Sequence, residues 1–406
     1  MTLEQSLNEC SGGVTAPIGY LAGGLYAGIR KAKKDLALVV SQKPATVAGV
    51  FTLNKTQAAC IVVDKLQLQR SKTCSAVIVN SGNANACTGE RGLNDAWTMV
   101  EETATALGLP KDQVLVSSTG VIGQYLPMDV VVSGITQLSK QLSANGNRDA
   151  AESIMTTDTY SKETAVKFTL GSSVVTIGGM AKGSGMIAPN MATMLAFVTT
   201  DAVIGQPLLT KALRHANSRS FNRITVDGDM STNDMALVLA NGAAGNAPIK
   251  DHTEEYQIFV AALEYVMIKL AKMIARDGEG ATKLVEVLVT GAVSEDQAAQ
   301  AAKAVANSNL VKTAIHGADA NWGRILAAVG YSGIDFNPDL VEVAFDDVPV
   351  LLRNYEIVLD EEKAKLALSK DSVLLTINLN QGNASARVWT CDLTKQYVHI
   401  NASYRS

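Results

Sequence analysis

The sequence of 406 residues has little cysteine and histidine, which limits the kinds of site that it can build. Its five cysteines and four histidines are widely spaced, and no C-x-x-C pair occurs. Few, scattered and odd-numbered cysteines are typical of reduced thiols and not of a disulfide framework. Zinc sites need Cys and His ligands at short spacings. We therefore expect free thiols, no bound metal and a cytoplasmic protein.

Long apolar runs, a secretory leader and basic tracts are missing as well. No stretch approaches the roughly 18 apolar residues of a membrane-spanning helix. The first residues, M-T-L-E-Q-S-L-N, have neither the basic nor the apolar region of a signal peptide. The formal net charge is −4 without a cluster of Lys and Arg, whereas nucleic-acid-binding proteins have a basic face. We expect small-molecule substrates, and neither nucleic acid nor membrane as a partner.

Phosphate-binding loops are a further absence. The Gly-rich stretch G-G-M-A-K-G-S-G (178–185) fits neither G-x-x-x-x-G-K-[ST] nor G-x-G-x-x-G. Its flanking methionines and Ile187 are too apolar for an exposed hairpin. Lys182 is the only charge in this stretch. Its side chain either extends to water or holds an anion such as a carboxylate, and the sequence leaves both open.

What is present is enough apolar sequence for a large core, with 47% hydrophobic and 18% charged residues. Alternating and β-branched runs predict strands, and 3.6-residue periodicity predicts helices. The predicted strands are 35–41, 47–53, 60–64, 75–80, 114–123, 166–170, 174–180, 285–290, 373–379, 386–392 and 397–402. The predicted helices are 93–107, 129–143, 205–218, 230–241, 253–276, 294–307 and 321–330. This mixture indicates a layered α/β or α+β fold, with a domain seam near 275–285.

Thr193 is a candidate nucleophile in the stretch A-P-N-M-A-T-M-L. One interpretation is a loop that leads into a buried strand, and the other is a reactive hydroxyl at a strand start. A hydroxyl needs an adjacent base, and no histidine lies near in the sequence. If the Ala192–Thr193 bond were cut, the new α-amine, with a pKa of about 8, could take the hydroxyl proton.

Two further stretches have a simple and a chemical interpretation. The predicted strand that ends at Thr119-Gly120 is either an ordinary strand-to-turn junction or a pair of N–H donors for an oxyanion. Glu279, between two glycines in A-R-D-G-E-G-A-T-K, lies either on a solvated turn after a helix C-cap or at a binding site. The last residues, N-A-S-Y-R-S, either fray or are tied down.

The motifs together resemble the ornithine acetyltransferases, the bifunctional acetyltransferases of arginine biosynthesis. The resemblance runs nearly end to end and is most specific in K-G-x-G-M-I-x-P-N-M-A-T-M-L. It rests on G-V-T-A-P-I-G-Y (13–20), A-G-V-F-T-L-N-K (48–55), V-N-S-G-N-A-N-A-C-T-G (79–89), S-S-T-G-V-I-G (117–123), I-M-T-T-D-T (154–159), M-A-K-G-S-G-M-I-A-P-N-M-A-T-M-L (180–195), D-G-D-M-S-T-N-D (227–234), A-R-D-G-E-G-A-T-K (275–283) and G-A-D-A-N-W-G-R (317–324).

This resemblance implies a layered, αββα-like α/β fold shared with self-processing aminopeptidases, with a smaller C-terminal α/β part and chemistry of the N-terminal-nucleophile type. It implies self-cleavage between Ala192 and Thr193 into an α chain (1–192) and a β chain (193–406). The two chains would stay associated as an α2β2 assembly.

The resemblance also implies site residues and a reaction. Thr193 would take the acetyl group of N-acetylornithine and pass it to glutamate, with Thr119 and Gly120 as the oxyanion hole. Substrate contacts would fall on Thr156, Lys182, Thr193, Glu279, Asn401 and Ser406; the last is often Thr in the family. No cofactor is implied, although acetyl-CoA is a co-substrate of some members. Two alternatives stay open: a self-processing aminopeptidase or amidase, and an uncleaved protein that binds acetylated amino acids.

Overall fold

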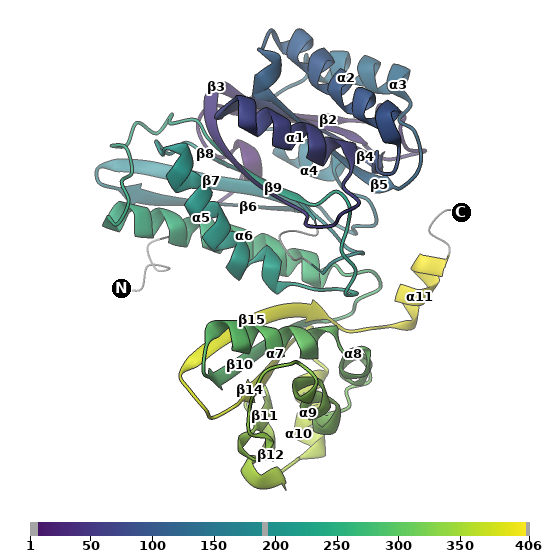
Figure 1. Cartoon of the computed structure of the whole chain (residues 1–406), viewed down its shortest axis with the longest axis vertical. Coiled ribbons are helices and arrows are strands. Elements are labelled where there is room, and N and C mark those ends of the chain that lie inside the picture. Colours follow the sequence, from purple (N-terminus) through teal and green to yellow (C-terminus); the bar gives the residue numbers. More distant parts are fainter. Residues whose placement is uncertain (1–6, 189–193, 403–406) are drawn as a thin grey trace. The chain divides into compact units, whose positions relative to one another are not determined.

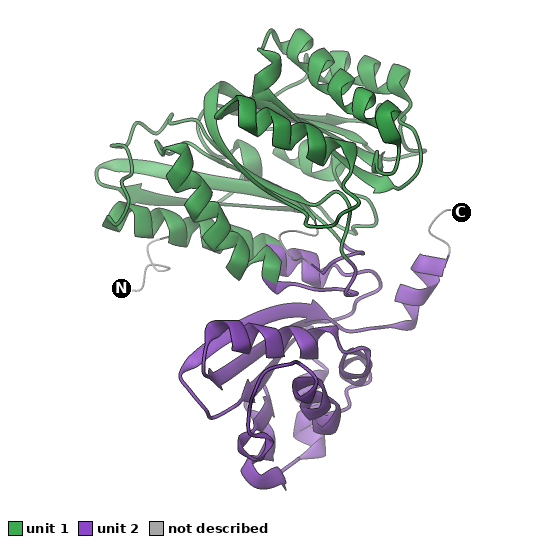
Figure 2. Cartoon of the chain, in the orientation of Figure 1, with its two compact units in different colours: residues 1–183, 189–222, 230–270 green, residues 184–188, 223–229, 271–406 purple. Residues whose placement is uncertain are grey.

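The computed structural model describes residues 7–188 and 194–402 (Figure 1). The predicted cleavage residues Ala192 and Thr193, and the predicted substrate contact Ser406, lie outside the described residues. The chain forms two compact units (Figure 2). The first comprises residues 1–183, 189–222 and 230–270, and the second comprises residues 184–188, 223–229 and 271–406.

A single mixed sheet of nine strands organises the described part of the first unit. Strands β4 and β5, and strands β8 and β9, are parallel, and the other pairs are antiparallel. The long strand β3 pairs with β2 along its first half and with β9 along its second. The order is β1 (Asn8–Cys10), β6 (Lys162–Leu170), β7 (Ser173–Lys182), β8 (Leu195–Thr200), β9 (Met235–Ala240), β3 (Leu36–Phe51), β4 (Thr73–Asn83) and β5 (Val114–Val121), with β2 (Tyr20–Leu25) on β3.

Helices cover this sheet and enclose its apolar side chains. Figure 1 shows α1, α2 and α3 grouped beside β4 and β5, and α5 and α6 beside β7 to β9. In α2, residues Ala96, Met99, Val100 and Thr103 are buried at the spacing of one helical face. The helices are α1 (Ala59–Arg70), α2 (Gly89–Leu107), α3 (Met128–Leu138), α4 (Asn147–Ser153), α5 (Gln206–Arg219) and α6 (Glu254–Arg276).

The second unit has its own sheet and core. Along β10, Val285, Val287 and Val289 are buried and alternate with partly exposed residues, as one covered face requires. The strand order is β13 (Glu356–Ile357), β12 (Val348–Leu352), β11 (Glu342–Phe345), β14 (Ser372–Asn378), β10 (Leu284–Ala292) and β15 (Ala384–Cys391). The helices are α7 (Glu295–Asn307), α8 (Asn309–His316), α9 (Trp322–Gly330), α10 (Glu361–Leu368) and α11 (Lys395–Ala402).

The predicted layered α/β class is confirmed, and so is the hairpin of β6 and β7 around residues 171–173. The predicted domain seam near 275–285 stays a prediction. The chain passes from the first unit to the second for the last time between Leu270 and Ala271, within α6.

Three predicted elements were wrong. The strand predicted at 60–64 is the start of α1, whose buried residues Cys60, Ile61, Val63, Asp64 and Gln67 follow a helical spacing. The helix predicted at 230–241 is β9, which is buried on both faces in the middle of the sheet. The strand predicted at 397–402 is α11. Short apolar runs do not distinguish a buried strand from a helical turn.

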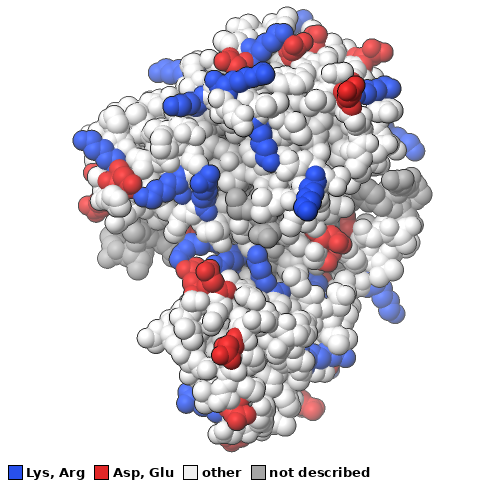
Figure 3. All heavy atoms as spheres, in the orientation of Figure 1, with Lys and Arg blue, Asp and Glu red and all other residues white. Residues whose placement is uncertain are grey.

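No helix among the described residues is both long and apolar enough to cross a bilayer. On the face shown in Figure 3, Lys and Arg side chains are interspersed with Asp and Glu and with uncharged atoms. This distribution agrees with the small net charge and offers no single basic surface there.

Candidate active site

Lys182, the last residue of β7, brings three predicted site residues together. Its side chain is only 8% exposed. Lys182 Nζ donates a hydrogen bond to Thr156 Oγ1 at 2.7 Å and to Thr119 Oγ1 at 3.3 Å. Thr119 lies at the end of β5, and Thr156 lies in the segment after α4. The interpretation that Lys182 extends to water is therefore wrong.

Thr156 is held by a buried carboxylate that sequence reasoning did not single out. Asp158 accepts the backbone N–H of Thr156 at 2.9 Å and that of Gly183 at 2.7 Å. It also pairs with the buried Lys162, with 2.7 Å between Nζ and Oδ1. Burial by itself raises the pKa of Asp158, but the charges of Lys162 and Lys182 outweigh it and hold the pKa well below the usual value. The only sequence signal was the motif I-M-T-T-D-T.

At the end of β5, the backbone lies unusually close to that of β4. Gly120 pairs with Gly82 across the parallel β4–β5 ladder and has a φ of +135°. A Cβ at Gly120 would lie 2.2 Å from the carbonyl carbon of Gly82. Only glycine fits this left-handed, crowded position. The chain therefore bends at Thr119-Gly120, where the oxyanion hole is predicted.

Asn233 stabilises this bend, and sequence reasoning did not single it out either. Its buried side-chain amide donates to Ala84 O at 2.6 Å and to Ser118 O at 2.8 Å. Thr232 Oγ1 donates to Asn233 Oδ1 at 2.6 Å. The amide therefore ties the ends of β4 and β5 to the start of β9. It belongs to the motif D-G-D-M-S-T-N-D, whose residues had no predicted role.

The residues that follow Thr193 are fixed in the same sheet. Met235 N donates to Met194 O at 3.0 Å. Leu195 pairs with Lys182 of β7 on one side and with Met235 of β9 on the other. All six residues of β8 are buried. Both interpretations of this stretch placed a strand after Thr193, and β8 is that strand, which begins beside Lys182.

Glu279 belongs to a second polar cluster, in the second unit. Its side chain is only 6% exposed, so the interpretation as a solvated turn is wrong. Asn401 Nδ2, on α11, donates to Glu279 Oε2 at 2.7 Å. Glu279 N donates to Ser184 O at 3.0 Å. The carboxylate packs on Gly185, where a Cβ would lie 2.4 Å from its oxygen.

Asp227, another residue of the motif D-G-D-M-S-T-N-D, holds the segment that carries Gly185. Its carboxylate accepts the N–H groups of Met186 at 2.6 Å and Ile187 at 2.8 Å. Tyr397 Oη donates to it at 3.2 Å. Burial, followed by the negative charge of Asp227, raises the pKa of Tyr397 well above its usual value. The phenol therefore stays protonated and keeps donating to Asp227.

The described residues offer no group of three His, Cys, Asp or Glu that could hold a metal ion. All five cysteines are free thiols. The two clusters offer hydroxyls, two buried lysines and buried carboxylates. Such groups suit the binding of a zwitterionic amino acid and acyl transfer to or from a hydroxyl.

Comparison with known proteins gives nearly full-length matches. The model of the ArgJ family matches residues 21–406. The arginine biosynthesis bifunctional protein ArgJ of Symbiobacterium thermophilum is 52% identical over 98% of this chain and 99% of its own. The ArgJ protein of Caldanaerobacter subterraneus is 49% identical over 97% of this chain and 99% of its own length.

Two solved structures match as well. The crystal structure of the ArgJ protein of Bacillus halodurans is 48% identical, with a TM-score of 0.50. It covers 51% of this chain and 98% of its own. An ornithine acetyltransferase of Mycobacterium tuberculosis, solved in complex with ornithine, is 39% identical, with a TM-score of 0.43. It covers 46% of this chain and 100% of its own.

The nearly full-length matches to ArgJ proteins define an acyltransferase of arginine biosynthesis. The chain belongs to the ArgJ family. The resemblance drawn from the motifs is thereby confirmed. The roles of the individual site residues stay predictions.

Proposed function

We propose that the chain transfers the acetyl group of N-acetylornithine to glutamate through an acetyl ester on Thr193. The observation that carries this proposal is the junction at Lys182. There, a buried cation contacts the hydroxyls of Thr119 and Thr156, on a strand that pairs with the residues directly after Thr193. That Thr119, Thr156 and Lys182, which are distant in sequence, lie in contact supports the proposal.

In the first half-reaction, Thr193 Oγ attacks the acetyl carbon while the Thr193 α-amine takes the hydroxyl proton. The backbone N–H groups of Thr119 and Gly120 stabilise the oxyanion. The C–N bond then breaks, and the amine returns the proton to the leaving nitrogen of ornithine. In the second half-reaction, the amine of glutamate attacks the ester, which releases N-acetylglutamate and regenerates the Thr193 hydroxyl.

Substrate charges fit the two clusters. Lys182 binds the α-carboxylate that both substrates share, and Thr156 contacts the same end. Glu279 binds the side-chain ammonium of ornithine, because a buried carboxylate favours a cation beside it. Asn401 orients that carboxylate through its 2.7 Å hydrogen bond. Ser406 is proposed as a further contact at this end.

Cleavage between Ala192 and Thr193 is part of the proposal. The solved Bacillus halodurans chain matches over 98% of its length but covers 51% of the 406 residues, about 207. This matched length is greater than the 192 residues that precede Thr193. It fits within the 214 residues from Thr193 to Ser406. The ArgJ proteins from Symbiobacterium thermophilum and Caldanaerobacter subterraneus match at full length. A relative that is found as about half a chain supports cleavage near this position.

The first test is the intact mass of the denatured protein. We expect two chains, of residues 1–192 and 193–406. Thr193→Ala should give one uncut, inactive chain, because it removes the attacking hydroxyl. Thr193→Ser should still cut, since the hydroxyl remains. Normal processing of Thr193→Ala would place the cleavage elsewhere and remove Thr193 as the nucleophile.

The second test separates acetyl transfer from hydrolysis. With N-acetylornithine alone, the cleaved enzyme should release one ornithine per site and then stop, and glutamate should restore turnover with ping-pong kinetics. Sustained release of free acetate without glutamate would instead support an amidase. Tight binding of acetylornithine by an uncut chain without turnover would support a binding protein.

A second activity is proposed because the relatives are named bifunctional proteins. Acetyl-CoA would then serve as a co-substrate that acetylates Thr193, and no other cofactor is invoked. The test uses acetyl-CoA as the sole acetyl donor and glutamate as the acceptor. Formation of N-acetylglutamate that Thr193→Ala abolishes would support this activity, and a background rate would remove it.

A further inference from the structure

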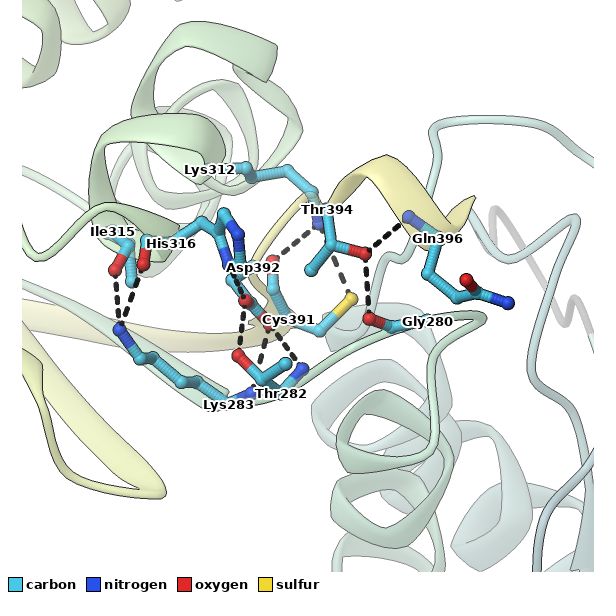
Figure 4. Close-up of polar contacts among 10 residues, drawn as sticks. All are labelled: Gly280, Thr282, Lys283, Lys312, Ile315, His316, Cys391, Asp392, Thr394 and Gln396. Carbon is cyan, nitrogen blue, oxygen red and sulfur yellow. Dashed lines mark hydrogen bonds and ion pairs between the residues drawn. The ribbon is translucent and has the colours of Figure 1, made fainter. Parts of the chain in front are cut away.

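Asp392 lies at the centre of a hydrogen-bonded cluster to which no role above has been given (Figure 4). Its carboxylate is only 2% exposed. It accepts the backbone N–H of Thr282 at 2.8 Å, the Thr282 hydroxyl at 2.6 Å and the backbone N–H of Lys283 at 2.9 Å. All three donors lie in the turn that begins at Glu279. Asp392 therefore holds the far end of that turn.

Thr394 holds the near end. Thr394 Oγ1 donates to Gly280 O at 2.8 Å and accepts the N–H of Gln396 at 3.1 Å. Gly280 has a φ of +71°, and a Cβ there would lie 2.7 Å from Tyr397 N. The backbone after β15 thus runs in close contact with the residue next to Glu279. We call Asp392 and Thr394 the turn clamp.

The turn clamp also sets the start of the helix that carries Asn401. Helix α11 begins at Lys395, one residue after Thr394, and Asn401 on it donates to Glu279. The carboxylate and its amide partner therefore extend from the two segments that the clamp joins. A shift of one segment along the other would change the distance between them.

Asp392 of the turn clamp is supported by neighbouring residues and stays ionised. Lys283 Nζ donates to Ile315 O at 2.8 Å, and His316 Nδ1 lies 2.8 Å from Asp392 Oδ2, so the end of α8 supports it. Burial by itself raises the pKa of Asp392, but hydrogen bonds from Thr282, Lys283 and His316 outweigh it and leave the pKa below its usual value. An ionised carboxylate makes its hydrogen bonds stronger.

We propose that Asp392 and Thr394 are positioning residues that set the place of Glu279 and Asn401, and so determine the preference for a substrate with a side-chain ammonium. This proposal rests on the role given to Glu279 above. Neither residue touches the substrate. They act because a carboxylate that binds an ammonium must be held to within a fraction of an ångström.

The test compares the KM for N-acetylornithine with the KM for glutamate in the processed enzyme. Asp392→Asn keeps the size of the side chain and one oxygen for the N–H groups of Thr282 and Lys283. It removes the negative charge and replaces Oδ2, the acceptor of the Thr282 hydroxyl, with an NH2 group. We expect it to raise the KM for N-acetylornithine about tenfold, as the loss of a charge-assisted hydrogen bond does, and to leave the KM for glutamate within about twofold. Thr394→Val should act in the same direction and more weakly. Equal changes in both KM values would overturn the proposal, since general damage would produce them.

Three further variants make each outcome decisive. Lys363→Met removes a charge from an exposed ion pair with Asp360, outside the turn clamp, and should leave both KM values unchanged. Glu279→Gln is the reference: if it does not raise the KM for N-acetylornithine, the proposed role of Glu279 fails. If it does while Asp392→Asn and Thr394→Val do not, only the positioning role fails. If Asp392→Asn does not fold, two other variants test the positioning role in its place. They are Thr394→Val and Thr282→Val, the second of which removes the hydroxyl that donates to Asp392.

Discussion

At the scale of the residue, the first cluster joins a buried carboxylate, Asp158, to two buried lysines. The carboxylate of Asp158 is committed to Lys162 and to two backbone N–H groups. Lys182 contacts the hydroxyls of Thr119 and Thr156. The two hydroxyls orient the ammonium of Lys182, and its charge also lowers the pKa of Asp158. This arrangement suits a lysine that recognises a carboxylate common to two substrates.

Replacing Lys182 should therefore affect both substrates together. Lys182→Met keeps the apolar stem and removes the charge. We expect the KM for N-acetylornithine and that for glutamate each to rise at least about tenfold, because each loses a charge-assisted hydrogen bond. Steady-state kinetics of the processed enzyme measures this. Lys370→Met, at an exposed ion pair with Asp346, is the control. An increase for only one substrate would assign Lys182 a different role.

The buried Asp158 should make stability depend on acid. Its pKa in the folded protein lies below the value of about 3.9 in an unfolded chain. The carboxylate therefore stabilises the fold above about pH 4, and this contribution is lost as the pH falls toward the folded-state pKa. Asp158→Asn should lower the free energy of unfolding by about 3 kcal/mol near pH 7. The difference from wild type should shrink below about pH 4.

Chemical denaturation at several pH values measures that difference. Glu101→Gln, at an exposed ion pair with Lys111, should change stability by less than about 1 kcal/mol at every pH. A difference between wild type and Asp158→Asn that stays constant down to pH 3 would contradict the ionised, paired state of Asp158.

At the scale of the element, the start of β9 does more than continue the sheet. Asn233 joins the ends of β4 and β5, and Met235 N binds the carbonyl of Met194 at the start of β8. The bend at Thr119-Gly120 and the residue that follows Thr193 are thus fixed by one short segment. A displacement of β9 would move the oxyanion donors relative to the nucleophile that we propose.

Removing the amide of Asn233 should lower both stability and turnover. Asn233→Ala takes the donor from two buried carbonyls, and we expect a loss of about 3 kcal/mol. The value of kcat should fall at least about tenfold, with a smaller change in KM, because the oxyanion acts only in the transition state. Denaturation and kinetics measure the two effects. Asn94→Ala, on an exposed position of α2, should change neither. If Asn233→Ala lowered the stability but left kcat unchanged, Asn233 would have a structural role and no role in positioning the oxyanion donors.

At the scale of the whole molecule, the predicted cleavage does not follow the division into units. Strands β8 and β9 come after Thr193 but lie between β7 and β3, which come before it. Continuous hydrogen-bonded ladders join β7 to β8 and β9 to β3. Two polypeptides interleaved in one sheet stay together after the peptide bond between them is cut.

Native mass spectrometry should therefore find both chains in one particle, and separation should require denaturant. An α2β2 assembly has twice the 42.8 kDa of one chain, about 86 kDa. A particle with the mass of one precursor would agree with two chains that stay together and would contradict the α2β2 assembly. Chains that separate under native conditions would contradict both the association of the chains and the α2β2 assembly.

The sequence by itself determined what depends on neighbours along the chain. Gly171 and the alternating runs beside it were sufficient for the β6–β7 hairpin, because a turn and a period of two are local features. Contiguous motifs were sufficient for the ArgJ family and for the candidate residues Thr119, Thr156, Lys182 and Glu279.

Tertiary structure alone decided which interpretation of a short apolar run is realised and which distant side chains meet. The runs at 60–64 and 235–240 have no period that separates helix from strand, so their packing decides. Asp392 and Thr282 are 110 residues apart, and their hydrogen bond follows from the order of strands in the second sheet. Asp158, Asn233 and Asp392 were missed for this reason: a buried polar side chain is defined by the partners that satisfy it, and those partners come from elsewhere in the fold.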